Sequence, residues 1–241
     1  MRYFIELSYH GKKYHGWQIQ PDVMSVQEKL NSAVSTVLQE EIQVVGAGRT
    51  DTGVHASQMF AHFDTRKNLD HKIVFKLNSI LPNDISVAQV FLVEDDKHVR
   101  FDAISRSYEY KIWLGRNPFL LDFSWQIHSQ RPDLNAMNKA AALLLEYEDF
   151  QCFSKVKTEV YTFNCNVTQA FWEQKDNELT FYISANRFLR NMVRAIVGTL
   201  MDVGLGKISK EDFRKIIESK NRSNAGLSVP AKGLFLTQIK Y

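Results

Sequence analysis

Apolar and polar residues alternate along several short stretches of the chain and follow a helical spacing along others. Residues 3–9 place Tyr3, Ile5, Leu7 and Tyr9 at every second position, a period of two that is typical of a β-strand. The same alternation, or a short apolar run between turn residues, predicts strands over 42–45, 57–63, 86–93, 105–114, 160–172, 179–185 and 233–241.

Helical spacing predicts five helices. Ser25 and Glu28 have the separation of a capping box, and the apolar residues after Ser25 recur on one helical face. A later helix starts near Phe188 and ends at Gly204 and Gly206, since glycine readily adopts the left-handed conformation that ends helices. The predicted helices cover 26–38, 71–80, 134–145, 188–203 and 209–218.

The order of these elements indicates the fold class. Strands and helices interleave without a regular β-α-β repeat, and several neighbouring strands are joined by links of hairpin length. This favours the α+β class over a doubly wound parallel sheet. Because the pattern restarts near residues 95–105, we predict two similar subdomains, 1–103 and 104–241, each a mixed or antiparallel sheet with packed helices.

Composition excludes several classes of protein. A chain of 241 residues with 44% hydrophobic and 24% charged residues can bury a core, which excludes disordered and collagen-like proteins. Apolar runs such as 140–145 and 195–201 are far shorter than the roughly 20 residues of a membrane helix. Since residues 1–9 read as a strand and not as an export signal, we expect a cytoplasmic protein without a membrane span.

Charge and cysteine content add little. Thirty Lys and Arg against 27 Asp and Glu give a net charge of +3, which is too small to indicate a nucleic-acid partner without knowing where the charges lie. Cys152 and Cys165 are the two cysteines. They indicate buried thiols or at most one disulfide, and they exclude a four-thiolate zinc site. The histidines show no metal-binding spacing, and His55 is better explained as bracing its loop.

The segment Gly46-Ala47-Gly48-Arg49-Thr50-Asp51-Thr52-Gly53-Val54-His55-Ala56 concentrates the chemistry between two predicted strands. It lacks the Lys-Ser or Lys-Thr of a phosphate-binding loop. It reads either as an ordinary turn in which Asp51 bonds its own backbone, or as an active site. In the second reading Asp51 is a nucleophile or base and Arg49 handles the substrate.

Three segments, Arg49–Ala56, Arg106–Tyr110 and Phe188–Gly198, together resemble the TruA family of tRNA pseudouridine synthases. Arg49 to Ala56 matches the run that carries the family's catalytic aspartate, and Arg106-Ser107-Tyr108-Glu109-Tyr110 is similar to its Arg-x-Tyr-x-Tyr strand. Phe188 to Gly198 is similar to its Phe-Leu-x-x-Met-Val-Arg-x-Ile-Val-Gly helix. The chain departs from the family in having Val229-Pro230 for an Ala-Pro pair and Glu148 for a histidine, and both changes lie outside the catalytic run Arg49–Ala56.

The resemblance implies a function and a site. It implies isomerisation of uridine to pseudouridine at positions 38–40 in the anticodon stem-loop of tRNA, by a homodimer without metal or small-molecule cofactor. Asp51 would be the catalytic carboxylate, with Arg194 as its partner and Tyr108 packing on the target base. Arg49 would either fill the space that the base vacates or hold the extruded nucleotide. We expect Asp51, Tyr108 and Arg194 to lie in a cleft between the two subdomains.

A basic surface for RNA is expected from a helical spacing. Arg187, Arg190 and Arg194 fall at i, i+3 and i+7, so a helix would place them on one side, with Arg187 and Arg190 near RNA phosphates. Residues with basic or stacking side chains that extend this surface would be Lys12, Lys13, His15, Trp17, Arg66 and Lys67.

Two other functions remain open on the sequence. An RNA-binding module that keeps the fold without the chemistry would gain nothing from a carboxylate such as Asp51 facing phosphates. A glycosidase or nucleosidase acting on small ligands would normally need a second catalytic carboxylate, and neither Asp64 nor Asp102 has a convincing spacing for that role. Whether Asp51 acts as nucleophile or base is likewise open.

Overall fold

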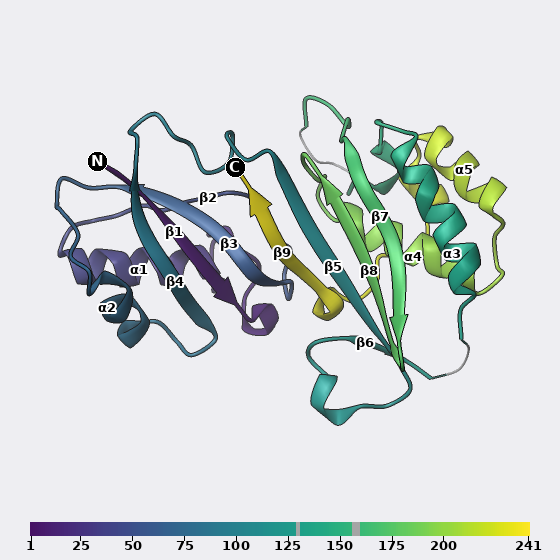
Figure 1. Cartoon of the computed structure of the whole chain (residues 1–241), viewed down its shortest axis with the longest axis horizontal. Helices are drawn as coiled ribbons and strands as arrows, with labels where there is room; N and C mark the ends of the chain where they lie inside the picture. Colours follow the sequence, from purple (N-terminus) through teal and green to yellow (C-terminus); the bar gives the residue numbers. More distant parts are fainter. Residues whose placement is uncertain (129–130, 156–159) are drawn as a thin grey trace. The chain divides into compact units, whose positions relative to one another are not determined.

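The chain forms two compact units (Figure 1). A computed structural model describes residues 1–128, 131–155 and 160–241. The first unit consists of Met1–Ile104 and Phe235–Tyr241, and the second of Ser105–Leu234. The boundary lies one residue from the one predicted, but the final strand does not belong with 104–241. The reason is backbone pairing, because Phe235 and Leu236 pair in parallel with His55 and Ala56 of the first unit.

The first unit contains a mixed sheet. β1 (Arg2–Tyr9) lies between β4 (Ile85–Val93) and β3 (His55–Asp64), antiparallel to both. The other edge of β3 pairs with the two remaining strands, antiparallel with β2 (Val45–Gly46) and parallel with β9 (Leu234–Lys240).

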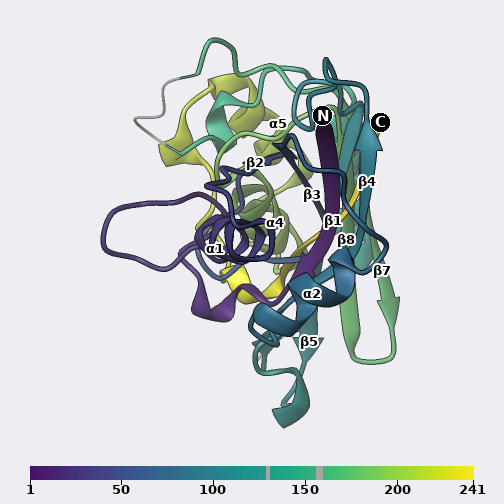
Figure 2. The ribbon, with the colours of Figure 1, turned by 90° about the vertical axis from the view of Figure 1, so that its left-hand side faces the viewer.

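Two helices accompany this sheet, α1 (Val26–Leu38) and α2 (Ile73–Ile80). Ser25 and Glu28 form the predicted capping box, since each side chain bonds the other residue's backbone N–H. Figures 1 and 2 show α1 lying across one face of the sheet. The apolar side of α1 is buried there, at Val26, Leu30 and Val34.

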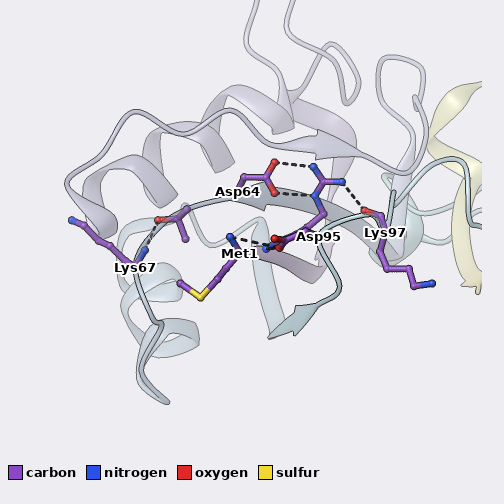
Figure 3. A network of polar contacts seen from close by, with 7 residues as sticks. Met1, Asp64, Lys67, Asp95 and Lys97 are labelled. Atoms are coloured by element: carbon purple, nitrogen blue, oxygen red, sulfur yellow. Dashed lines mark hydrogen bonds and ion pairs between the residues drawn. The ribbon is translucent and has the colours of Figure 1, made fainter.

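Polar contacts join the start of β1 to the end of β3 (Figure 3). The guanidinium of Arg2 donates to both carboxylate oxygens of Asp64 at 2.8 and 2.9 Å and to the carbonyl of Lys97 at 2.8 Å. The amino group of Met1 lies 3.6 Å from a carboxylate oxygen of Asp95. The two hydrogen bonds from Arg2 to Asp64 tie together two residues that also pair across β1 and β3, and so support the register of these strands.

The second unit also contains a mixed sheet. β8 (Glu178–Ala185) lies between β5 (Ser105–Leu114) and β7 (Val167–Lys175), antiparallel to both. The short strand β6 (Trp125–Ile127) pairs in parallel with the end of β5. Figure 1 shows α3 (Leu134–Ala141), α4 (Met192–Gly204) and α5 (Lys210–Ser219) beside this sheet.

The fold class is confirmed, since each unit combines a mixed sheet with helices. Several boundaries differ from those predicted. The strand expected over 42–45 is only β2, the strand expected from 160 begins at Val167, and the helix expected over 134–145 continues beyond Ala141 as a 3-10 turn. None of the helices among the described residues has both the length and the apolar character that crossing a membrane requires.

Candidate active site

Asp51 lies on the short loop between β2 and β3 in the first unit. Its side chain is half-buried, whereas Arg49 is exposed and Thr50 is buried. The backbone N–H of Val54 donates to the carbonyl of Asp51 at 3.1 Å, which closes a turn around Thr52 and Gly53. The loop therefore presents a carboxylate and a guanidinium on backbone that is itself hydrogen-bonded.

A second loop, residues 10–17 after β1, holds the Asp51 loop in place. The N–H of Trp17 donates to the carbonyl of Thr50 at 3.3 Å, and the N–H of Gly53 donates to the carbonyl of Tyr14 at 3.2 Å. The hydroxyl oxygens of Tyr9 and Thr50 are 2.8 Å apart. Asp51 is thus bracketed on both sides by hydrogen bonds to residues 9–17.

His55 braces the same loop, as expected from the sequence. Its side chain is 2% exposed, and its Nδ1 accepts a hydrogen bond from the N–H of Gly11 at 3.0 Å. The imidazole lies between two rings, with centroids 4.6 Å from His10 and 4.7 Å from Phe235. The ring is therefore fixed in orientation from three sides.

Trp17 has a structural role that the sequence reasoning missed. The expectation that Trp17 extends a basic RNA surface is wrong, because its side chain is 2% exposed and packs against Tyr9 and Gly46. A Cβ on Gly46 would lie 2.3 Å from the indole Nε1. A glycine leaves room for a large aromatic ring to pack against the backbone, and this could have indicated that Trp17 is buried. The sequence does not indicate, however, which glycine faces which ring.

Tyr14 and Asp84, which the sequence reasoning also missed, form the other support of residues 10–17. The hydroxyl of Tyr14 donates to Oδ1 of Asp84 at 2.5 Å, and Nζ of Lys13 lies 3.3 Å from Oδ2. Burial, together with this hydrogen bond, raises the pKa of Tyr14 well above its usual range. Burial also acts to raise the pKa of Asp84, but the donors Tyr14 and Lys13 outweigh it and hold that pKa below its ordinary value.

Tyr108 lies in the second unit, on β5. It pairs with Ile183 of β8, and its half-buried ring meets the ring of Phe188 edge-on with centroids 5.1 Å apart. An edge-on aromatic contact of this kind orients the ring.

Arg194 lies in the first turn of α4 and is half-buried. Its Nε donates to the carbonyl of Val229 at 2.7 Å, and the N–H of Val229 donates to the carbonyl of Arg194 at 3.2 Å. Both bonds use backbone atoms of Val229, so valine in place of the family's usual alanine does not remove them. The hydroxyl of Tyr110 donates to the carbonyl of Pro230, the residue after Val229, at 2.8 Å. Burial raises the pKa of Tyr110, although the positive charge of Arg194 acts to lower it.

Arg187 and Arg190 are not on α4, contrary to the prediction. The helix begins at Met192, because Asn191 adopts the left-handed conformation with φ of 65°. Arg187, Arg190 and Arg194 therefore do not share one side of a helix. Arg190 is exposed and Arg187 is half-buried, and both lie on the non-helical segment that leads into α4.

The predicted site residues divide between the two units. Arg49 and Asp51 share one loop of the first unit, and Tyr108, Arg187, Arg190 and Arg194 belong to the second.

Within the ranges 1–128, 131–155 and 160–241, no three His, Cys, Asp or Glu side chains gather into a group suited to a metal ion. Cys152 and Cys165 are buried free thiols, and burial raises the pKa of both.

The sequence comparisons with known proteins agree with one another. A family model described as tRNA pseudouridine synthase matches residues 7–102 and 140–241. The tRNA pseudouridine synthase A of Bacteroides fragilis is 52% identical, with 100% of this chain and 96% of that protein covered. The proteins of the same name from Thermoanaerobacter pseudethanolicus and Bacillus subtilis are 40% and 36% identical, with 98% and 100% of this chain and 98% and 99% of those proteins covered.

A solved structure of the CRISPR endoribonuclease Cse3 bound to RNA aligns with a TM-score of 0.21 and 10% identity, over 85% of this chain and 97% of that one. A score this low carries no conclusion. The family model, by contrast, covers the Asp51 loop and α4, and the Bacteroides fragilis relative, which spans 100% of this chain, also covers Tyr108. The chain therefore belongs to the tRNA pseudouridine synthase family, enzymes that isomerise uridine to pseudouridine in tRNA.

Proposed function

We propose that this chain converts uridines at positions 38–40 in the anticodon stem-loop of tRNA to pseudouridine, with Asp51 as the catalytic carboxylate. The observation that carries the proposal is the half-buried carboxylate on a loop whose backbone is hydrogen-bonded one residue before it, at Thr50, and two residues after it, at Gly53. A catalytic group held in this way loses little freedom when the substrate binds.

The reaction needs few groups. The bond from N1 of uracil to C1′ of the ribose breaks, the uracil turns, and C5 bonds to C1′. C5 loses its proton and N1 gains one, so the product is an isomer of the substrate. No electron is gained or lost. Asp51 serves this sequence either by bonding to C1′ as the uracil leaves or by removing the C2′ proton. Deuterium at C2′ separates these routes, because only the second breaks the C2′–H bond and gives a primary isotope effect.

The family resemblance assigns supporting roles to residues of the second unit. Arg194 would stabilise the ionised carboxylate, since a guanidinium offsets the tendency of burial to neutralise it. Tyr108 would retain the detached uracil by stacking, and its ring is already oriented by Phe188 at 5.1 Å. Arg187 and Arg190 would contact RNA phosphates from the segment before α4.

The proposal also assigns a role to Arg49. Arg49, which is exposed next to the carboxylate, would hold the extruded nucleotide.

The protein would act in the cytoplasm as a homodimer, with tRNA as its partner. Sedimentation equilibrium of the purified protein tests the dimer, because a mass of one chain at the concentration of the assay would contradict it.

Tritium release tests the function. tRNA transcripts labelled at C5 of uridine are incubated with wild type and with Asp51→Asn, since formation of the new bond at C5 expels the hydrogen. We expect release from substrates with uridine at positions 38–40 and none from transcripts with cytidine at all three. Asp51→Asn should bind tRNA and release no tritium. Tritium release by a folded Asp51→Asn protein at the wild-type rate would refute the role of this carboxylate.

A further inference from the structure

Asp84 accepts hydrogen bonds from both ends of the segment His10–Tyr14, which begins the 10–17 loop. Its backbone carbonyl accepts from the N–H of His10 at 2.9 Å, while its carboxylate accepts from the Tyr14 hydroxyl at 2.5 Å and lies 3.3 Å from Nζ of Lys13. The Asp84 side chain is 14% exposed and the Tyr14 residue 2% exposed. A charge-assisted hydrogen bond in such surroundings is stronger than one in water.

The opposite side of the 10–17 loop contacts the residues around Asp51. The carbonyl of Tyr14 accepts from Gly53, two residues after the carboxylate, and the N–H of Trp17 donates to Thr50, one residue before it. The contacts therefore run from Asp84 through Tyr14 to the backbone of the Asp51 loop.

The two loops are packed without space between their backbones. A Cβ added to Gly11 would lie 2.0 Å from the carbonyl oxygen of Val54, and one added to Gly16 would lie 2.3 Å from that of Thr50. Backbones in such close contact cannot move independently, because a closely packed interior transmits displacement. A shift of Tyr14 must therefore shift the Asp51 loop as well.

We propose that Tyr14 and Asp84 are positioning residues for Asp51, which set the place of its carboxylate through the 10–17 loop without touching the substrate. This rests on the proposed function of Asp51. Neither residue lies within the Arg49–Ala56 run on which that function was assigned. Because misplacement of a catalytic group by about 1 Å costs up to about a hundredfold in rate, the hydrogen bond from Tyr14 to Asp84 contributes to kcat.

Tyr14→Phe is the principal test, since it removes one oxygen and keeps the buried ring. We expect kcat for tRNA pseudouridine formation to fall about tenfold, with KM for tRNA changed less than about twofold. Asp84→Ala should lower kcat in the same way. The double variant should be no slower than the slower single variant, because both changes break the same contact.

Asn78→Ala is the matched control. Asn78 of α2 donates to the carbonyl of Val87 and accepts from its N–H, both at 2.8 Å, so it anchors the strand that follows Asp84 without contacting residues 10–17. We expect this variant to lower the melting temperature at least as much as Tyr14→Phe and to keep the wild-type kcat. Rates are compared at saturating tRNA and at a temperature where all variants are folded.

The outcomes separate the inference from the proposed function. Wild-type kcat in Tyr14→Phe, or a loss of kcat matched by Asn78→Ala, would overturn the positioning role while Asp51→Asn remained inactive. Full activity of Asp51→Asn would instead remove the proposed function on which the inference rests. A tenfold loss of kcat in Tyr14→Phe alone, with tRNA binding retained, is the result that supports it.

Discussion

The hydroxyl oxygens of Tyr9 and Thr50 lie 2.8 Å apart, and Thr50 is the residue immediately before Asp51. Thr50 is 8% exposed, so the contact is shielded from water. Its carbonyl accepts from Trp17 at the same time. The backbone leading into the carboxylate is therefore held through both the side chain and the main chain of one residue.

Thr50→Val should be slower and less stable than wild type. Valine keeps the shape of threonine but removes the hydroxyl, and loss of a buried hydrogen bond costs about 1 kcal/mol in the free energy of unfolding. We expect kcat to fall several-fold, because the residue before Asp51 loses one of its restraints. Urea unfolding and tritium release measure the two effects.

Thr52→Val is the matched control for this change. Thr52 follows Asp51 in the same loop but is exposed, and exposed substitutions usually change stability by less than about 0.5 kcal/mol. Equal losses of stability and rate in the two valine variants would show that the contact with Tyr9 has no particular role.

Gly16→Ala should be far more damaging than Gly48→Ala. Gly16 has a φ of +88°, which favours glycine, and a Cβ there would lie 2.3 Å from the carbonyl oxygen of Thr50. A Cβ on Gly48 meets no atom within 4 Å. We expect Gly16→Ala to lose about 2 kcal/mol or more of stability, and Gly48→Ala to unfold like wild type. Similar melting temperatures for the two variants would show that the close approach of Gly16 to Thr50 does not limit stability.

These two glycines also show what the sequence could not reveal. The alternation of residues 3–9 and the capping box at Ser25 depend on neighbours in the chain, and both were predicted correctly. The contact of Gly16 with Thr50 joins residues 34 positions apart. Nothing local distinguishes Gly16, which has no space for a side chain, from Gly48, which has it.

Arg194→Lys should lower kcat by about tenfold or more. Nε of Arg194 donates to the carbonyl of Val229 at 2.7 Å, and lysine has neither that N–H nor a planar guanidinium. Arg190→Lys is the matched control. Arg190 is exposed, and a lysine keeps the point charge that a phosphate contact needs. Steady-state rates on tRNA test both variants, and a wild-type kcat for Arg194→Lys would remove Arg194 from the proposed site.

The outcome for these arginines illustrates a second limit of sequence reasoning. Their spacing is helical, but Asn191 takes a left-handed conformation and the helix begins only at Met192. An asparagine tolerates that conformation better than most residues, yet asparagine also occurs within helices. The family motif located Arg194 on α4, whereas the periodicity extended the helix four residues too far for Arg187 and Arg190.

We expect His62 to make the stability of the first unit dependent on pH. The residue is 4% exposed, its Nδ1 accepts from the N–H of Val99 at 3.3 Å, and its ring lies 4.8 Å from that of His98. Burial lowers the pKa of His62 to about 4, and the positive charge of Arg2 acts in the same direction. The folded protein therefore keeps this imidazole neutral at pH values where the unfolded chain binds a proton.

The sign of the effect follows from that difference. Between the ordinary histidine pKa of about 6.5 and the folded value of about 4, the unfolded state holds more protons, so stability falls as the pH falls. His62→Asn does not titrate and keeps an acceptor near the N–H of Val99. We expect the variant to lose less stability than wild type between pH 7 and pH 5, by on the order of 1–2 kcal/mol in urea unfolding. Above about pH 7.5 the imidazole is neutral in both states, so the difference between the two proteins should there be constant, and equal losses on acidification would show that His62 carries no part of the pH dependence.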